Sequence, residues 1–370
     1  MAADRRTERK EIMANHLNRF REILKLRGIQ AALITSEVNQ SWLCGFDFTD
    51  GYVLVTKEQA YVITDFRYAE AAKAKADRSF EVIVPDGMLA KIAALLKEHG
   101  ENRMFFEEAT LSVETLEKLK EKLPDVKLFS GASAIIDGLR EIKDADEIKK
   151  IAKAQDIADA AFSHILTFIS PNMTEIDVAL ELEFYMRKNG ASATSFDTIA
   201  VSGQASSLPH GVPRNVKLEK GFFTMDFGAV YQGYCSDMTR TVVLGKADAA
   251  MKKLYNTVLE AQRAGLAAAR PGVGCREMDQ EARDIINKAG YKGCFGHSLG
   301  HGVGKYIHEN PRVAPGAPED SVLRPGHVVT VEPGIYVEGK YGCRIEDMIV
   351  ITEDGSRNFA HSPKELMELL

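Results

Sequence analysis

Two stretches in the second half of the chain share one design: FFTMDFGAVYQGYCSDMTRTVVL (222–244) and HVVTVEPGIYVEGKYGCRIEDMIVI (327–351). In each stretch, apolar and β-branched residues flank a turn that contains a glycine, Gly233 in the first and Gly339 in the second. This pattern is the sequence signal of an antiparallel hairpin. The sequence therefore predicts two antiparallel hairpins in the second half of the chain.

Each predicted hairpin carries two acidic residues, Asp226 and Asp237 in the first and Glu332 and Glu346 in the second. If the first turn is centred near residues 231–232 and the second on its glycine, the two acids of each hairpin lie opposite each other. Directly opposed side chains have Cβ atoms only ~4.5–5.5 Å apart. Two carboxylates that close repel each other, and burial among Phe, Met, Val and Ile makes the charge costly without a cation. Two such pairs predict two cations.

The hairpins belong to an internal repeat. Four helices are predicted in this half, two before each hairpin: 151–169, 174–189, 250–269 and 276–289. Pro171 and Gly190, which end the first two helices, recur as Pro271 and Gly290. Proline after a helix and glycine at its C-terminal end are sound stop signals. We therefore predict an α+β domain with a pseudo-two-fold duplication, in which the two hairpins form one curved sheet, the helices cover its outer face and the acids converge at the centre.

The first part of the chain alternates strand-like and helix-like segments, which favours a layered α/β domain. The predicted strands are 31–35, 52–56, 61–64, 80–84 and 103–107. The predicted helices are 67–76, 88–99, 111–122 and an earlier one, whose apolar face is Met13, Leu17, Phe20 and Leu24 and which Gly28 ends. The segment 139–150 marks the junction, because Asp144 followed by Glu147 is a capping-box pattern that opens a helix. A chain of 370 residues is long for one core, so we expect two domains, 1–140 and 141–370.

Composition narrows the class of protein. Apolar residues make up 45% of the chain and charged residues 27%, with a net charge of −6 and no Lys/Arg stripe, so nucleic acid is not an expected partner. No apolar run reaches the ~18–20 residues that a bilayer requires, and no membrane association is expected. The N-terminal segment MAADRRTERKEIM is charged where a signal peptide is apolar. The 5 cysteines are scattered without CxxC spacing, which is typical of reduced thiols, so a cytoplasmic location is expected.

A glycine-rich stretch between the hairpins, GCFGHSLGHGVGKYIHEN (293–310), supplies a histidine, His301, with glycine on both sides. Four acids and one imidazole suit Mn²⁺, Co²⁺, Fe²⁺ or Zn²⁺ in a carboxylate-bridged pair better than a tetrahedral structural zinc site. A phosphate cradle is the alternative use of the glycines, but no strand leads into a GxGxxG pattern here.

Further candidate site residues lie in the loops and strands next to the proposed metals. His210, His297 and His308 are interpreted as proton or substrate contacts. Arg344 precedes Glu346 by two residues, so its side chain shares that strand face and can orient the carboxylates.

These residues resemble those of the pita-bread metallopeptidases, the family of methionine aminopeptidase, aminopeptidase P, prolidase and creatinase. The resemblance covers essentially the whole chain and implies a pita-bread catalytic domain behind a creatinase/prolidase-type N-terminal domain. It implies five metal ligands: Asp226, Asp237, His301, Glu332 and Glu346. It further implies that Asp237 and Glu346 bridge two divalent ions per subunit, with Mn²⁺ expected, and that Glu332 is the general base. In relatives the N-terminal domain helps to form a dimer, so a homodimer is expected.

The resemblance also indicates a branch of the family. Methionine aminopeptidases lack the long N-terminal domain and the later histidine, and creatinase-like members have lost metal ligands. The proline-specific peptidases match at His210, at the HxxxH pair His297 and His301, at His308, and at the junction with Arg140, Lys143 and Glu147. The implied reaction is hydrolysis of the Xaa-Pro imide bond of a proline-containing peptide. In it, His308 binds the scissile carbonyl or the oxyanion, and His210 and His297 bind substrate.

Three functions remain open. An Xaa-Pro aminopeptidase (aminopeptidase P) is preferred, because the short connections 190–215 and 303–327 leave little chain to close the cleft beyond the proline. An Xaa-Pro dipeptidase (prolidase) is the alternative, and Arg312 favours it if this side chain binds a free substrate carboxylate rather than solvent. An inactive scaffold is the third possibility, which the intact ligand set disfavours.

Overall fold

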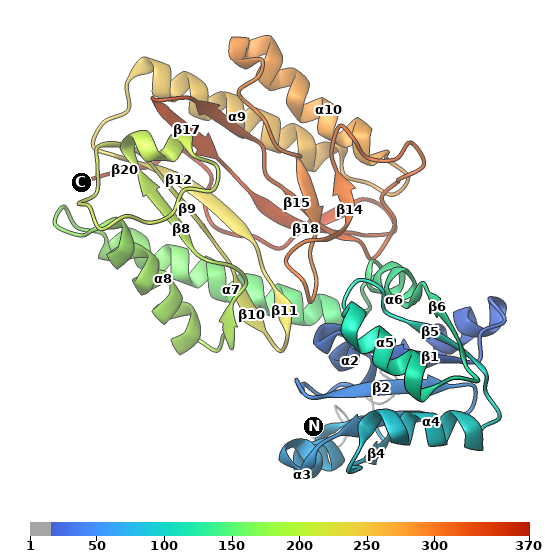
Figure 1. The fold of residues 1–370 in the computed structure, drawn as a ribbon. Coiled ribbons are helices and arrows are strands. Elements are labelled where there is room, and N and C mark those ends of the chain that lie inside the picture. The colour runs from blue at the N-terminus through green and yellow to red at the C-terminus, as the bar shows by residue number, and fades with distance from the viewer. Residues whose placement is uncertain (1–15) are drawn as a thin grey trace. The chain divides into compact units, whose positions relative to one another are not determined.

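The computed structural model describes residues 16–370, so the predicted absence of a signal peptide concerns a segment, 1–15, outside the described residues. The chain forms two compact units, one ending at Arg140 and one comprising Glu141–Leu370 (Figure 1). Within 16–370, no helix combines the length and apolar character needed to cross a bilayer.

The first unit is built on one mixed six-stranded sheet with the strand order β4-β3-β2-β1-β5-β6. Its strands are β1 (Ala31–Ile34), β2 (Gly51–Thr56), β3 (Ala60–Thr64), β4 (Glu81–Ile83), β5 (Arg103–Phe106) and β6 (Lys127–Ser130). Its helices are a segment over 16–26, α2 (Glu37–Cys44), α3 (Phe66–Lys75), α4 (Met88–Glu98), α5 (Val113–Lys122) and α6 (Ala132–Arg140). The predicted α/β layering is therefore present, with β6, α2 and α6 in addition to the predicted elements.

Both faces of this sheet are buried, because successive side chains of a strand point to opposite sides. Ala32 and Ile34 pack in the cluster that contains Trp42 of α2, whereas Leu33 packs in the cluster that contains Leu95 of α4. Helices on each face thus share one central sheet, which gives three layers.

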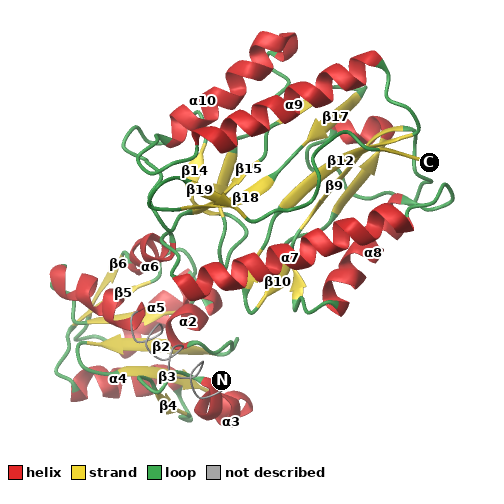
Figure 2. Cartoon of the chain, turned by 180° about the vertical axis from the view of Figure 1, so that it is seen from behind, coloured by secondary structure: helices red, strands yellow, loops and turns green. Residues whose placement is uncertain are grey.

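The second unit contains the two predicted helix pairs. They are α7 (Ala145–Phe168) with α8 (Glu175–Lys188) and α9 (Ala249–Ala268) with α10 (Cys275–Ile286). The capping box that opens α7 is formed as predicted, since Asp144 caps the helix and Glu147 Oε2 accepts from the Asp144 amide at 2.8 Å. In both views the strands of this unit lie between the long helices α7 and α9 (Figures 1 and 2).

The strands form two main sheets and two short ladders, not one continuous sheet as the sequence suggested. One main sheet has the order β20-β12-β9-β8, with β8 (Ile199–Ser202), β9 (Gly221–Phe227), β12 (Met238–Leu244) and β20 (Glu368–Leu369). The other has the order β14-β13-β15-β18-β19, with β13 (Gly300–Gly302), β14 (Glu309–Val313), β15 (Val328–Val331), β18 (Asp347–Ile351) and β19 (Ser356–Asn358). Of the short elements, β11 (Tyr234–Cys235), β10 (Ala229–Tyr231) and β7 (Ala193–Thr194) form a three-stranded sheet in that order, and β16 (Gly334–Val337) pairs with β17 (Tyr341–Arg344). The two main sheets meet where the Glu346 amide donates to the Thr239 carbonyl at 3.1 Å.

The second hairpin has the predicted register. Gly334 pairs with Arg344 and Val331 with Asp347, so Glu332 and Glu346 lie opposite each other between the two ladder segments. The turn contains Gly339 with φ 69°, a conformation that glycine adopts readily.

The first hairpin departs from the predicted register, because its turn is centred one residue later than predicted. Its turn is Gln232–Gly233, with φ 50° and 79°, because Tyr231 pairs with Tyr234. Asp226 therefore lies opposite Thr239, and Asp237 lies diagonally across from Asp226. Diagonal neighbours remain on the same face of the ladder, so the predicted convergence of the two aspartates survives the shift.

Candidate active site

Five strands bring the proposed ligands to one place. Asp226 lies near the end of β9, Asp237 directly before β12, and His301 at the centre of β13. Glu332 follows β15, and Glu346 precedes β18. Asp237, His301 and Glu346 are all buried and offer ligand atoms that lie within 4.8 Å of one another. His301 Nε2 is 3.5 Å from Asp237 Oδ2 and 3.4 Å from Glu332 Oε1.

The glycines on either side of His301 are required by close backbone packing. A Cβ atom at Gly300 would lie 2.0 Å from the Thr330 carbonyl oxygen, and one at Gly302 would lie 2.1 Å from the Asn310 carbonyl oxygen. Side chains at these positions would push β13 away from its neighbours β15 and β14. The glycine pair therefore holds the His301 ring against the carboxylates.

Burial favours the protonated, neutral form of the carboxyl groups in the absence of a cation. Burial, followed by repulsion from neighbouring carboxylates, raises the pKa of Asp237 and of Glu346 well above its usual value. Burial raises the pKa of Glu332 to about 8. A divalent cation would replace this repulsion by attraction.

One atom of the cluster points directly to such a cation. Asp226 Oδ2 accepts from Arg344 Nη2 at 2.6 Å, but Asp226 Oδ1 is buried without a hydrogen-bond partner. A buried oxygen without a partner is costly, and metal coordination would satisfy it. The donor set, oxygen-rich with one imidazole, fits Mn²⁺, Co²⁺, Fe²⁺ or Zn²⁺.

Threonines hold two of the carboxylates in place, and sequence reasoning missed both. Thr239 Oγ1 donates to Glu346 Oε2 at 2.6 Å, and Thr330 Oγ1 donates to Glu332 Oε1 at 3.2 Å. Each is two residues from a proposed ligand, Asp237 or Glu332, and therefore on the same strand face. That spacing is the signal by which they could have been found.

Arg344 lies behind the acids, on the strand face where its spacing from Glu346 predicted it. Besides bonding to Asp226, it donates to Thr239 Oγ1 at 2.9 Å and to the Tyr336 hydroxyl at 2.7 Å. The Arg344 side chain is buried and donates to protein atoms. It therefore orients the Asp226 carboxylate directly and the Glu346 carboxylate through Thr239.

His297 is already fully hydrogen bonded within the protein. Its Nδ1 donates to the Ser298 carbonyl at 2.9 Å, so in the neutral ring Nε2 accepts from the Tyr336 hydroxyl at 3.0 Å. Burial, followed by the charge of Arg344, lowers the pKa of His297 to about 4, so the ring is neutral at pH 7. A direct hydrogen bond from His297 to substrate would require one of these contacts to break, a cost that the sequence could not reveal.

A cavity of about 610 Å³ opens over the acids. His210, His308 and Arg312 are exposed and line it, and the His308 ring lies edge-on to the His301 ring with centroids 4.4 Å apart. Apolar side chains that the sequence did not single out line the same cavity: Phe196, Ile199, Val212 and Ile307. The cavity thus offers polar groups that can bind a peptide and apolar surface that can bind its side chains.

The side chains of the three junction residues contact different parts of the chain. Arg140 ends the first unit and donates to Asn39 there at 2.6 Å. Lys143 forms a buried ion pair with Glu309, the neighbour of His308, at 2.9 Å. Glu147 accepts from the Tyr234 hydroxyl at 2.9 Å. Lys143 therefore anchors the segment that carries His308.

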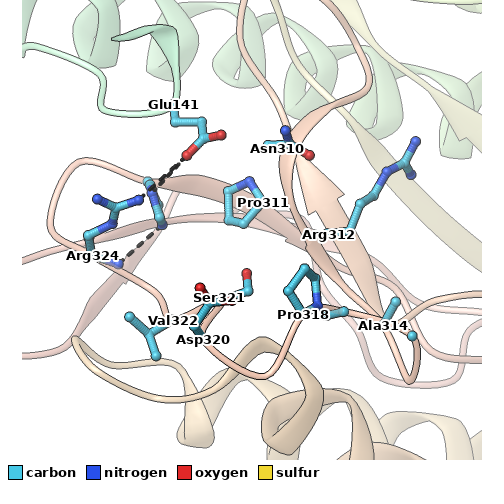
Figure 3. Close-up of a pocket in the computed structure, with 13 residues that line it drawn as sticks. Glu141, Asn310, Pro311, Arg312, Ala314, Pro318, Asp320, Ser321, Val322 and Arg324 are labelled. Atoms are coloured by element: carbon cyan, nitrogen blue, oxygen red, sulfur yellow. Dashed lines mark hydrogen bonds and ion pairs between the residues drawn. The ribbon is translucent and has the colours of Figure 1, made fainter. Parts of the chain in front are cut away.

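A second cavity of about 740 Å³ lies beside the first, and Arg312 lines both. Its other lining residues include Glu141, Arg324 and His327, with Arg324 Nη2 3.7 Å from Glu141 Oε2. In the close-up, the Arg312 guanidinium extends away from Glu141 and Arg324 (Figure 3). The lining of this cavity holds no cluster of acids comparable to that of the first, so the chemistry belongs to the first cavity.

A buried group of carboxylates and one imidazole at the base of a cavity is the arrangement of a metal-dependent hydrolase. Comparison with known proteins identifies the family. The model of metallopeptidase family M24 matches residues 149–353, and that of the creatinase/prolidase N-terminal domain matches residues 16–142. The chain belongs to metallopeptidase family M24.

Individual relatives are similar over nearly the whole chain. It is 37% identical to an Xaa-Pro dipeptidase of Pyrococcus horikoshii over 359 residues, 96% of this chain and 100% of that protein. A solved structure of an Xaa-Pro dipeptidase from Bacillus anthracis is similar with a TM-score of 0.92 and 44% identity, covering 96% of this chain and 100% of that one. An X-Pro aminopeptidase structure from Thermotoga maritima is similar with a TM-score of 0.88 and 35% identity, covering 92% and 98%. The names of the relatives thus favour the dipeptidase alternative over the aminopeptidase that the sequence led us to prefer.

Proposed function

We propose that the protein is an Xaa-Pro dipeptidase that uses two divalent metal ions, most simply Mn²⁺. Asp226, Asp237, His301, Glu332 and Glu346 would hold the ions. The observation that carries the metal site is the buried cluster of Asp237, His301 and Glu346, together with the partnerless oxygen of Asp226. The similarity over whole chains to proteins named Xaa-Pro dipeptidase supports the choice of substrate.

When bound, the two ions would lower the pKa of a water molecule and polarise the scissile carbonyl. Glu332 would act as the general base, taking a proton from the attacking water and delivering it to the proline nitrogen. Thr330 holds the Glu332 carboxylate by the hydrogen bond from its hydroxyl group, which fixes the carboxylate for this transfer. His308, exposed beside His301, donates to the scissile carbonyl oxygen as negative charge develops there.

Arg312 is the residue that distinguishes the two proline peptidases. It is exposed, it lines the cavity, and in the described part of the chain no carboxylate forms an ion pair with it. A guanidinium binds a carboxylate with two parallel hydrogen bonds. A dipeptide ends directly after the proline, so Arg312 would bind its terminal carboxylate.

The reasoning that favoured an aminopeptidase is weakened by the walls of the cavity. We expected the connections 190–215 and 303–327 to leave the cleft open beyond the proline. Residues of both connections, among them Val212 and Ile307, line the cavity instead. An Xaa-Pro aminopeptidase remains the second candidate because one similar structure carries that name.

The test is an arginine substitution with a matched control. Arg312→Ala should raise KM for Ala-Pro by ~10–100-fold, because a hydrogen bond to a charged group contributes ~1.5–3 kcal/mol. KM for Ala-Pro amide, which lacks the carboxylate, should not change. Arg324→Ala removes an exposed arginine that lines only the second cavity and should leave both values unchanged. Equal KM of wild type and Arg312→Ala for Ala-Pro would contradict the assignment.

A further inference from the structure

Arg240 is a buried arginine that the proposed mechanism does not use. Its side chain is 1% exposed, and it lies three residues after Asp237 on β12. A guanidinium has five N–H donors. All of them are engaged: Nε donates to Pro363 O at 3.2 Å, Nη1 to Thr239 O at 2.9 Å and Glu346 O at 2.5 Å, and Nη2 to Asp347 Oδ1 at 2.7 Å and Ser362 O at 2.9 Å.

The two bonds of Nη1 join the halves of the duplication. Thr239 belongs to the strand of Asp237, whereas Glu346 belongs to the second hairpin, and one nitrogen binds the carbonyl oxygens of both. The Glu346 amide in turn donates to the Thr239 carbonyl at 3.1 Å. The backbone of Glu346 is therefore held on both sides, at its N–H by Thr239 and at its C=O by Arg240.

This bonding involves the backbone of Glu346 itself and of Thr239, which lies two residues after Asp237. The carboxylates of Asp237 and Glu346 offer ligand atoms within 4.8 Å of each other, and no regular ladder links their strands at this point. Their spacing consequently depends on the bonds between residues 239–240 and Glu346. Carboxylates that would hold metal ions bind them more tightly when neighbouring groups already orient them.

The ion pair with Asp347 does not by itself explain Arg240. The Asp347 carboxylate also accepts from Lys364 at 2.5 Å, from Gln262 at 2.9 Å and from Asn358 at 2.7 Å. If Arg240 is lost, Asp347 keeps a cation and two amide donors. The carbonyl oxygens of Thr239 and Glu346, by contrast, lose the one group that joins them.

We propose that Arg240 is a positioning residue that holds Glu346 against the Asp237 strand and so determines the affinity for the second divalent ion. The proposal rests on the two-metal site of the proposed function and is independent of the choice of peptide substrate.

The test measures metal binding directly. Metal-free wild type, Arg240→Lys and Lys364→Met are titrated with Mn²⁺ by calorimetry, and circular dichroism checks their folding. A lysine keeps the charge beside Asp347 but cannot bond both carbonyl oxygens and Asp347 in the arginine's geometry. Lys364→Met is the matched control, because it removes a cation from Asp347 and leaves the carbonyl contacts intact.

Arg240→Lys should raise the Kd of the second Mn²⁺ ion ~10–100-fold, the usual effect of losing a group that orients a metal ligand. Lys364→Met should change it less than about threefold. An equal rise of this Kd in both variants would show that only the interactions of Asp347 matter. An unchanged Kd in Arg240→Lys would show that Arg240 does not position Glu346. Either result overturns the proposal. Wild type that binds fewer than two ions also overturns it, whereas two-ion binding without dipeptidase activity refutes only the proposed substrate.

A second measurement needs no variant. Hydrogen exchange of the metal-free wild type should show the Glu346 amide protected before any Mn²⁺ is added, because its bond to the Thr239 carbonyl, which Arg240 also binds, exists without metal. Free exchange that becomes protected only on Mn²⁺ binding would mean that the ions, not Arg240, set the position of Glu346, and the proposal would fail.

Discussion

Removing the metals should make the protein less stable as the pH rises, and Glu332 is the group in which this effect can be isolated. Burial raises its pKa to about 8 in the folded, metal-free protein, against an ordinary value of 4.5. The folded protein therefore keeps a proton on Glu332 that the unfolded chain releases above pH 4.5. The corresponding stability is present in full below that pH and is lost progressively toward pH 8. Asp237 and Glu346, whose pKa values are also raised, act in the same direction.

The magnitude follows from the shift. Between pH 5 and 7 the Glu332 contribution falls by ~1.4 kcal/mol per pH unit, or ~2–3 kcal/mol in total. For a unit of the size of Glu141–Leu370, this corresponds to a fall in Tm of ~5–10 °C. Saturating Mn²⁺ should abolish the fall, because the ions stabilise the ionised carboxylates.

The assay compares Tm of chelator-treated wild type and Glu332→Gln at several pH values from 5 to 7. Glu332→Gln removes the titrating group, so the Tm of this variant should not show the Glu332-dependent fall. The Tm of the variant minus that of wild type should therefore increase by ~5–10 °C between pH 5 and pH 7. Glu175→Gln is a control of opposite sign, because its hydrogen bonds with Arg214 and Ser202 outweigh burial and lower the pKa of Glu175. The deficit of Glu175→Gln should be constant over this range, since both its folded and unfolded pKa values lie below 5. A constant Tm difference between metal-free wild type and Glu332→Gln would refute the reasoning.

Three further substitutions test the site. Glu332→Gln should retain the circular dichroism of the wild type but lose kcat by at least ~10²-fold, as expected for a missing general base, and more than a tenth of wild-type kcat would exclude that role. His308→Ala should lower kcat by ~10²–10³-fold with little change in KM, and an unchanged kcat would remove His308 from the mechanism. Gly302→Ala should lower Tm and weaken Mn²⁺ binding, because the new Cβ would lie 2.1 Å from the Asn310 carbonyl oxygen; wild-type values of both would show that β13 can move without harm.

Much of the fold follows from the sequence because its signals are local. Proline and glycine mark the ends of α7 to α10, and the capping box marks the start of α7. Helix α2 was missed because the polar residues Asn39 and Gln40 interrupt its apolar pattern, yet both are buried: Asn39 bonds to Glu107 and Arg140, and Gln40 to the Ile34 and Gly51 carbonyls. The error in the first hairpin came from its turn, since a shift of one residue in the turn centre changes the partner of every residue across the ladder.

The site is less completely encoded. The five proposed ligands stand out as acids and a glycine-flanked histidine among apolar residues, so the pattern predicts their convergence. The residues that hold them do not stand out, because Thr239 and Arg240 gain their roles only where the two halves of the duplication meet. Likewise, nothing in the sequence shows that Tyr336 occupies one nitrogen of His297.

The most direct test of the central claim is a comparison of kcat/KM for Ala-Pro and Ala-Pro-Ala with the Mn²⁺-loaded protein. We predict that Ala-Pro is cleaved more than tenfold more efficiently, because only the dipeptide places a carboxylate directly after the proline, within reach of Arg312. Cleavage of Ala-Pro-Ala as efficient as that of Ala-Pro, or more so, would contradict the dipeptidase assignment and identify the protein as an Xaa-Pro aminopeptidase.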